Sequence, residues 1–278
     1  MGRQKIRIGL VFDFDDTLAP DSTSQLLERL EVDPHEHWKA HAKLVKQGWD
    51  PIPAYLDQIL RLSRSRTKKD RVTQRYLQTV GASLAVYPGV APALKRYRAN
   101  LVKRRKDASL EAFVISSGIG EVIRASKLAP LFREIWACDY SYGEGKEIDG
   151  VKKVVSFTDK TRFLFHIQKG LIGARYSGDP FAVNKKVSHA DAYIPLDQVV
   201  VIGDGLTDVP CFSLVQKSGG IAVGVYDRSS REKFGKMRGL ISERRVSHPV
   251  AVDFRKHSGL DDAIEFAIDA ILYRLEYS

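Results

Sequence analysis

Short runs of apolar residues recur along the chain, and three of them end directly at an aspartate, a serine or a glycine. They lie at residues 6–12, 112–115, 199–202 and 221–225. Continuous apolar runs of this length are typical of strands that are covered on both faces, as in a parallel sheet. The pattern therefore predicts at least four buried strands.

Helical patterns lie between these runs, at residues 120–127, 161–169 and 260–275. In the last segment the apolar residues are spaced three or four apart, on one stripe. They are Leu260, Ile264, Ala267, Ile268, Ile271 and Leu275. Strands that alternate with helices predict an α/β fold with a Rossmann-like, doubly wound parallel sheet.

The segment from residue 22 to residue 86 has a different pattern, with no convincing strand. Residues 25–30, 37–46 and 52–62 read as helices, and 73–79 as a weaker one, with Pro34, Gly48 and Pro51 between them. We therefore predict two units. Residues 1–20 and 87–278 form the α/β core, and residues 21–86 form a small helical cap domain inserted after the first strand.

Two further segments are expected to lack helices. Residues 142–150 contain three glycines and predict a hairpin, whereas residues 173–196 form a long irregular stretch without a clear period. Long irregular stretches in a compact domain are often functional.

The composition, with 44% hydrophobic and 28% charged residues, is that of an ordinary globular protein. No apolar run is long enough for a transmembrane helix or for the core of a signal peptide, so we expect a cytoplasmic protein that does not bind membranes. Cys138 and Cys211 are too far apart in sequence to suggest a zinc site. The net charge of +10 favours anionic partners without choosing among them.

Acidic residues follow two of the predicted strands. Asp13 and Asp15 come directly after the first, and Asp204 and Asp208 come after the strand at 199–202. Ligands of open α/β sheets bind at the carboxyl ends of the strands, so these side chains are expected to share one pocket. Clustered carboxylates repel each other and need a cation, and oxygen ligands beside a phosphate favour Mg²⁺. Asp208 stands where a dinucleotide-binding fingerprint needs its third glycine, which excludes that function.

Two further sites suit phosphate oxygens. Ser116, Ser117 and Gly118 end the second strand just before a helix, where a hydroxyl and free backbone N–H groups can bind an anion. Lys160 stands at a helix start and would supply a positive charge. Other lysines between the motifs compete for this role, namely Lys146, Lys152 and Lys153.

In their order and local sequence these blocks resemble the haloacid dehalogenase superfamily. The first motif of that family, a strand followed by Asp-x-Asp-x-Thr, matches Asp13, Asp15 and Thr17. The three later motifs match Ser116, Lys160, and Asp204 with Asp208. Tyr-Pro-Gly at 87–89 and the Asp-Gly pair at 204–205 are most similar to the phosphoserine-phosphatase-like branch.

The resemblance implies a phosphatase that works through an aspartyl-phosphate. Asp13 would be the nucleophile and Asp15 the general acid and base. Mg²⁺ would be held by Asp13, by the backbone carbonyl of Asp15 and by Asp204.

The resemblance also implies how the phosphate of a small substrate would be bound. Thr17, Ser116, Ser117 and Lys160 would bind the phosphate oxygens. Asp208 would orient Lys160 or a metal-bound water.

One departure from the branch concerns its substrate. Phosphoserine phosphatases carry a glutamate shortly after the first motif to bind the amino group of the substrate, and the aligned residue here is Ser22, beside Asp21. Phosphoserine is therefore not indicated as the substrate.

Two alternatives remain open at this point. One is a phosphotransferase or mutase of the same superfamily, which the first motif does not distinguish from a hydrolase. The other is a nucleic-acid-binding or regulatory protein that uses its basic surface. Two basic runs support it, one between Arg61 and Arg71 and one at residues 103–106, and they would attract a nucleotide or a nucleic acid. Oligomeric state is not indicated.

Overall fold

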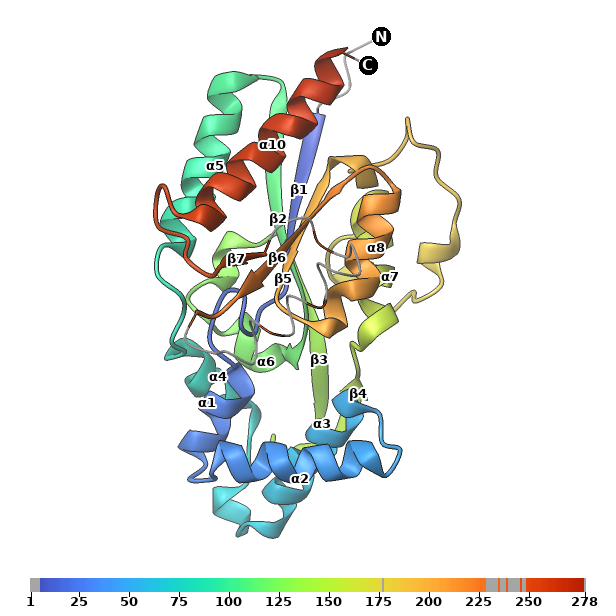
Figure 1. The fold of residues 1–278 in the computed structure, drawn as a ribbon. Helices are drawn as coiled ribbons and strands as arrows, with labels where there is room; N and C mark the ends of the chain where they lie inside the picture. The colour runs from blue at the N-terminus through green and yellow to red at the C-terminus, as the bar shows by residue number, and fades with distance from the viewer. Residues whose placement is uncertain are drawn as a thin grey trace.

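The structure, a computed structural model, describes residues 6–176, 178–228, 235, 239, 246 and 249–277. Its centre is a sheet whose described strands run in the order β4-β3-β2-β1-β5-β6-β7, and all neighbours are parallel except β3 and β4 (Figure 1). The strands are β1 (Ile6–Phe12), β2 (Ala108–Ile119), β3 (Glu134–Tyr142), β4 (Ile148–Lys153), β5 (Val199–Gly203), β6 (Ile221–Tyr226) and β7 (Pro249–Ala251).

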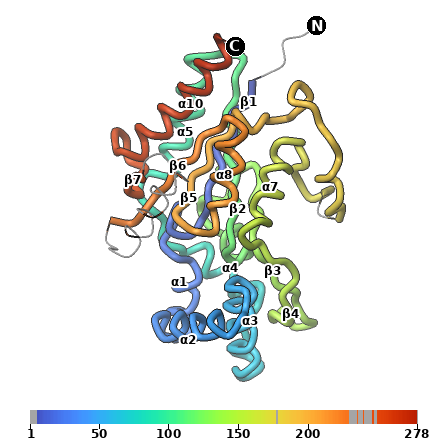
Figure 2. The backbone as a smooth tube through the Cα atoms, turned by 45° about the vertical axis from the view of Figure 1, so that its right-hand side comes forward, coloured from blue at the N-terminus to red at the C-terminus, as the bar shows by residue number. Residues whose placement is uncertain are grey.

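Helices cover both faces of this sheet. Helices α5 (Val90–Arg104) and α10 (Gly259–Tyr277) lie on one face, and α7 (Phe157–Lys169) and α8 (Val209–Lys217) lie on the other (Figures 1 and 2). The short helix α6 (Gly120–Arg124) follows β2. Every second residue of β1 from Ile8 to Phe12 is fully buried, as expected for a central strand. The predicted doubly wound α/β fold is confirmed.

Four helices between β1 and α5 lie beyond the carboxyl ends of the strands, at the bottom of Figure 1. They are α1 (Ser22–Arg29), α2 (Pro34–Lys46), α3 (Pro51–Ser65) and α4 (Gln74–Ala82). Each begins where a side-chain oxygen accepts a hydrogen bond from a backbone N–H of the first turn; the four capping residues are Asp21, Asp33, Asp50 and Thr73. In the part of the chain that the structure describes, no helix has the length and hydropathy needed to cross a membrane.

The β3–β4 hairpin extends from the sheet to these four helices. The hairpin expected at 142–150 is present, and its strands are longer than the glycines alone indicated. The backbone N–H of Ile148 donates to the carbonyl of Val72 at 2.9 Å, and that of Gln74 donates to Lys146 at 2.8 Å. The helical layer and the end of the hairpin therefore form one packed unit.

Some elements differ from the prediction. Strand β3 and helices α5 and α8 were not predicted, and the helix expected at 120–127 ends at Arg124. Polar residues such as Asp139 and Ser141 interrupt the apolar pattern of β3, because its second half leaves the parallel sheet and pairs with β4. The described residues between 173 and 195 are irregular, as expected, apart from turns of 3₁₀ helix at Ala174–Tyr176 and Ala182–Asn184, and a further turn begins at Leu196.

The contact between α4 and α6 gives a test of how tightly the helical layer is packed. A Cβ atom on Gly81 would lie 2.2 Å from the carbonyl oxygen of Val122 and 2.8 Å from the Cβ of Ala125. Alanine normally stabilises a helix relative to glycine, but here the backbone contact must open. We expect Gly81→Ala to lower the free energy of unfolding by about 1–3 kcal/mol in urea denaturation.

The control for this variant is Gly178→Ala, because no atom lies within 4 Å of a Cβ built at Gly178. We expect that change to stay within about 0.5 kcal/mol of the wild type. A Gly81→Ala protein as stable as the wild type would show that α4 and α6 do not pack this closely.

Candidate active site

Asp13 occupies the first position after the central strand β1 and is only 7% exposed. Its backbone N–H donates to the carbonyl of Ile202 on β5 at 2.9 Å, which extends the pairing of the two strands to this residue. One carboxylate oxygen, Oδ1, accepts from the N–H of Phe14 at 2.7 Å, and Oδ2 lies 3.0 Å from the Lys160 ammonium. Asp13 is therefore fixed in position by three elements.

Lys160, in the first turn of α7, connects the first and the last acidic clusters. Its Nζ lies 2.7 Å from Oδ1 of Asp208 and donates to the hydroxyl of Thr207 at 3.0 Å. The side chain is 1% exposed, and the two carboxylates raise the pKa of its ammonium against the effect of burial. Lys160 is therefore charged inside the protein.

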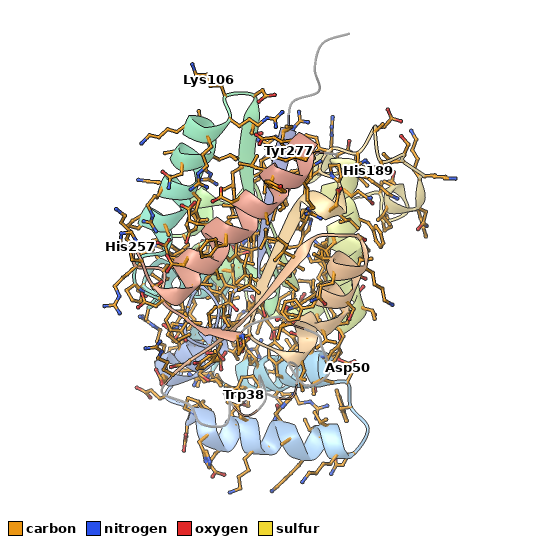
Figure 3. The ribbon with its side chains drawn as sticks, turned by 45° about the horizontal axis from the view of Figure 1, so that its top comes forward. Trp38, Asp50, Lys106, His189, His257 and Tyr277 are labelled. Carbon is orange, nitrogen blue, oxygen red and sulfur yellow. The ribbon has the colours of Figure 1, made fainter. Side chains whose placement is uncertain are left out.

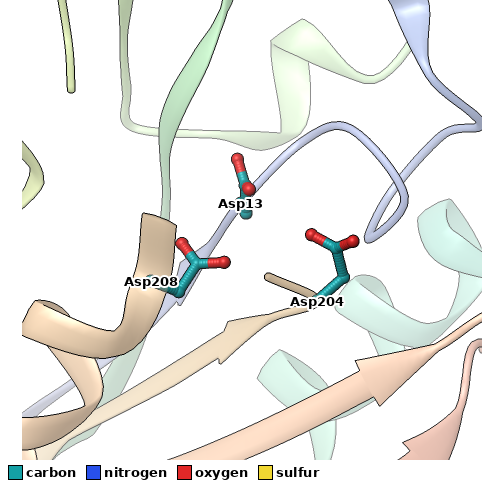
Figure 4. Close-up of side chains that lie close together, drawn as sticks. All are labelled: Asp13, Asp204 and Asp208. Carbon is teal, nitrogen blue, oxygen red and sulfur yellow. The ribbon is translucent and has the colours of Figure 1, made fainter. Parts of the chain in front are cut away.

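The carboxylates of Asp13, Asp204 and Asp208 gather at the ends of β1 and β5 (Figure 4), and one oxygen of each lies within 4.8 Å of the others. Burial raises the pKa of Asp204 well above its usual value, and the charges of Asp13 and Asp208 raise it further. Burial likewise raises the pKa of Asp208 to about 6, although Lys160 opposes the shift. One lysine does not offset the mutual repulsion of three carboxylates. Such a cluster of oxygen ligands suits a hard divalent cation such as Mg²⁺.

Asp15 lies apart from these three carboxylates. Its Oδ1 accepts from the backbone N–H of Ser22 at the start of α1, at 2.7 Å. Its Oδ2 is directed to the carboxyl-terminal part of β2, because a Cβ on Gly118 would lie 2.4 Å from it. Burial, and next the charge of Asp21, raise the pKa of Asp15 to about 8. The group therefore carries a proton at neutral pH in the metal-free protein.

Ser116, Ser117 and Gly118 lie in a bulge of β2, rather than after its end as the sequence indicated. Pairing with β3 stops at Ile115 and resumes at Ile119, so the residues between them have no partner strand. The N–H of Gly118 donates to the Ser116 hydroxyl at 3.0 Å. The buried hydroxyl oxygens of Thr17 and Ser117 have no hydrogen-bond partner among the described residues. Buried polar groups without a partner are rare in folded proteins.

The structure thus brings Asp13, Lys160, Asp204 and Asp208 together and places Gly118 of the β2 bulge against Asp15, while the roles of these residues stay predictions. The lysines that competed with Lys160 lie elsewhere; Lys153, for example, pairs with Asp139 at 2.8 Å. The contact of Thr207 with Lys160 was not predicted, although Thr207 is adjacent to Asp208. Nor was a contact of Tyr55 predicted, yet its hydroxyl donates to the carbonyl of Ser117 at 2.5 Å. No sequence signal marks a bond between residues 62 positions apart.

The basic runs do not form one surface beside this site. Two arginines of the first run contact other residues of the protein. Arg61 pairs with Asp57 at 2.6 Å, and Arg66 donates to the carbonyl of Leu30. The second run precedes β2 and so lies at the amino ends of the strands. Figure 3 shows Lys106 at the opposite end of the molecule from Trp38 and Asp50 of the helical layer.

The raised pKa of Asp15 predicts how the stability of the metal-free protein depends on pH. A folded-state pKa of about 8, against an unfolded value of 3.8, stabilises the fold below pH 4, and this contribution is lost as the pH rises through 8. Asp15→Asn cannot lose a proton, so its melting temperature should fall less than that of the wild type between pH 5 and pH 9. Thermal melts in EDTA measure the difference.

The control is Asp262→Asn, which changes an exposed residue of α10. Its melting curve should follow that of the wild type. If Asp15→Asn also follows the wild type, Asp15 is ionised in the folded protein and the argument from burial is wrong.

The carboxylate cluster predicts that Mg²⁺ stabilises the protein. At a free concentration ten times its dissociation constant, a ligand of the folded state adds about 1.4 kcal/mol. We expect Mg²⁺ to raise the melting temperature of the wild type and not that of Asp204→Asn, which removes one charge from the cluster. Equal shifts for both proteins would place the ion elsewhere.

Comparisons with known proteins agree with this architecture. No protein-family model matches the chain. An uncharacterised protein of Borreliella burgdorferi is 26% identical, over 77% of this chain and 80% of its own. Among solved structures, a HAD family hydrolase from Salmonella enterica serovar Typhi superposes with a TM-score of 0.60 and 13% identity, over 96% of this chain and 74% of its own.

Phosphoserine phosphatases are also structurally similar. A phosphoserine phosphatase solved as an analogue of its phospho-aspartyl intermediate covers 94% of this chain and 99% of its own, with a TM-score of 0.57 and 14% identity. At this identity the likeness concerns the fold alone. The chain therefore has the fold of the HAD family hydrolases and phosphoserine phosphatases, as the resemblance predicted.

Proposed function

We propose that the protein is a Mg²⁺-dependent phosphomonoester hydrolase that forms an aspartyl-phosphate on Asp13. The main support is the position of Asp13 at the carboxyl end of β1, 3.0 Å from the buried ammonium of Lys160. A carboxylate held beside a fixed positive charge can approach a phosphate without the full repulsion between two anions. The similar fold of phosphatases supports the same reaction class.

In the first step, a carboxylate oxygen of Asp13 forms a bond to phosphorus while the ester bond to the leaving oxygen breaks. Asp15 donates its proton to that oxygen, and the alcohol departs. The raised pKa of Asp15, about 8, keeps this proton available at neutral pH. In this proposal Lys160 and the Ser116 and Thr17 hydroxyls bind the oxygens of the transferring group.

In the second step, Asp15 takes a proton from a water molecule, whose oxygen forms a bond to phosphorus. The bond between phosphorus and Asp13 breaks, inorganic phosphate leaves, and both aspartates return to their starting states. Asp208 holds Lys160 in place throughout, at 2.7 Å.

Asp13 and Asp204, with the backbone carbonyl of Asp15, are the groups that would hold Mg²⁺. When bound, the ion supplies charge neutralisation to the transferring phosphoryl group. The clustering of Asp13, Asp204 and Asp208 supports this assignment, because one oxygen of each lies within 4.8 Å of the others.

In this proposal residues 21–86 are the cap and residues 1–20 and 87–278 are the catalytic core. The substrate is a small phosphorylated molecule bound between them. Ser22 and Asp21 stand at the start of α1, where Ser22 contacts Asp15 through its N–H. Asp21 caps the same helix through Thr23 at 3.0 Å, so its carboxylate is already engaged and phosphoserine is not favoured as the substrate.

Hydrolysis of p-nitrophenyl phosphate tests the proposal. We expect turnover that needs Mg²⁺, is abolished by EDTA, and falls by at least about 10³-fold in Asp13→Asn, because that variant lacks the nucleophile. Asp262→Asn, on the exposed face of α10, is the matched control and should keep the activity of the wild type. Activity that survives Asp13→Asn would contradict the mechanism.

If the folded wild-type protein does not turn over this substrate, trapping with beryllium fluoride gives the second measurement. A Mg²⁺-dependent adduct on Asp13 would show that the site is competent and that the cap excludes the substrate. Product analysis with an added alcohol distinguishes a hydrolase from a phosphotransferase, because only the latter yields a new phosphate ester in quantity.

A further inference from the structure

The peptide unit between Ser117 and Gly118 is held at both of its polar ends. Its carbonyl oxygen accepts a hydrogen bond from the hydroxyl of Tyr55 at 2.5 Å. Its N–H donates to the hydroxyl of Ser116 at 3.0 Å. Because a peptide unit is planar, the first bond fixes the direction of the second.

A second donor reaches the same carbonyl. The Sγ of Cys138, on β3, lies 3.2 Å from the Ser117 oxygen. Burial raises the pKa of the Cys138 thiol to about 11, so the group keeps its proton at neutral pH. A thiol is a weak donor, whereas a phenol is a good one, so Tyr55 makes the stronger of the two contacts.

Tyr55 is itself firmly placed. It lies in α3 of the helical layer, is 5% exposed, and packs against Trp38 of α2 with ring centroids 5.9 Å apart. The next residue in α3, Leu56, accepts a hydrogen bond through its carbonyl from the hydroxyl of Tyr140 at 2.9 Å. The helical layer therefore presents the Tyr55 hydroxyl to the bulge of β2 from a fixed position.

The Ser116 hydroxyl is held in position by the N–H of this fixed peptide unit. It is fully buried and accepts from Gly118, and it donates to no group among the described residues. Its proton is thus left available for a substrate oxygen. Asp15 lies on the other side of the same glycine, where a Cβ would meet its Oδ2 at 2.4 Å. Rotation of the peptide unit would therefore have two effects. It would move the hydrogen bond to Ser116, and it would displace Asp15, the proposed acid.

We propose that Tyr55 is a positioning residue through which the helical layer sets the conformation of the phosphate-binding segment, Ser116 to Gly118. This inference rests on the proposed function of that segment. It assigns the insert a part in binding the transferring phosphoryl group, in addition to covering the substrate.

The test compares Tyr55→Phe with Tyr140→Phe. Each variant removes one buried phenolic hydroxyl that donates to a backbone carbonyl, and the two carbonyls belong to the phosphate-binding segment and to α3 respectively. We expect Tyr55→Phe to lower kcat for p-nitrophenyl phosphate about tenfold, with a smaller change in KM, because the phosphate oxygens are bound most tightly in the transition state. It should also weaken binding of beryllium fluoride in the presence of Mg²⁺. Tyr140→Phe should lower the melting temperature and leave kcat within about twofold of the wild type.

Equal kcat values for Tyr55→Phe and the wild type, in a protein that turns over substrate, would overturn the inference and leave the proposed function standing. Equal losses in the two variants, in proportion to their melting temperatures, would also overturn it, because packing of the whole layer would then be the cause. If the wild type neither turns over substrate nor binds beryllium fluoride, both the proposed function and the inference are wrong.

Cys138 provides an independent variant. In the background of Tyr55→Phe, Cys138→Ala removes the remaining donor to the Ser117 carbonyl, whereas Cys138→Ser keeps a hydroxyl there. We expect the alanine double variant to lose a further severalfold in kcat and the serine double variant to lose less. Indistinguishable double variants would count against the carbonyl as the point of action.

Discussion

The buried contact of Lys160 with Asp13 and Asp208 is the interaction on which the rest of the site depends. It joins the first turn of α7 to the ends of β1 and β5, and all three side chains are less than 10% exposed. Removing one member of such a group leaves an unpaired charge in the interior, which is costly. These ion pairs therefore join α7 to β1 and to the segment after β5, in addition to the pairing of β1 with β5.

Once Asp204 is counted with Lys160, Asp13 and Asp208, the charges of the site do not balance. Three carboxylates and one ammonium leave two negative charges if every group is ionised, and this excess adds to the effect of burial in raising the pKa values of Asp204 and Asp208. A dication restores neutrality. The same surroundings therefore favour a bound cation and, without one, the protonated form of Asp204.

Much of this site follows from local sequence. Asp13 and Asp204 each come directly after an apolar strand, and parallel strands place their carboxyl ends at one edge, so their proximity follows from the fold class. The bulge of β2 and the bond from Tyr55 could not be predicted in this way. A backbone carbonyl is present at every residue, so nothing in the sequence marks Ser117 as the acceptor. Likewise β3 was missed because its polar residues serve the antiparallel pairing with β4 rather than the core.

The contact between the helical layer and the phosphate-binding segment has a consequence for the movement of that layer. If docking of α3 strengthens phosphate binding by a given factor, bound phosphate must strengthen docking by the same factor, since the two equilibria share one thermodynamic cycle. Bound substrate would then stabilise the docked position of the layer, and departure of inorganic phosphate would weaken that docking. One hydroxyl on α3 would in this way couple the occupancy of the pocket to access to it.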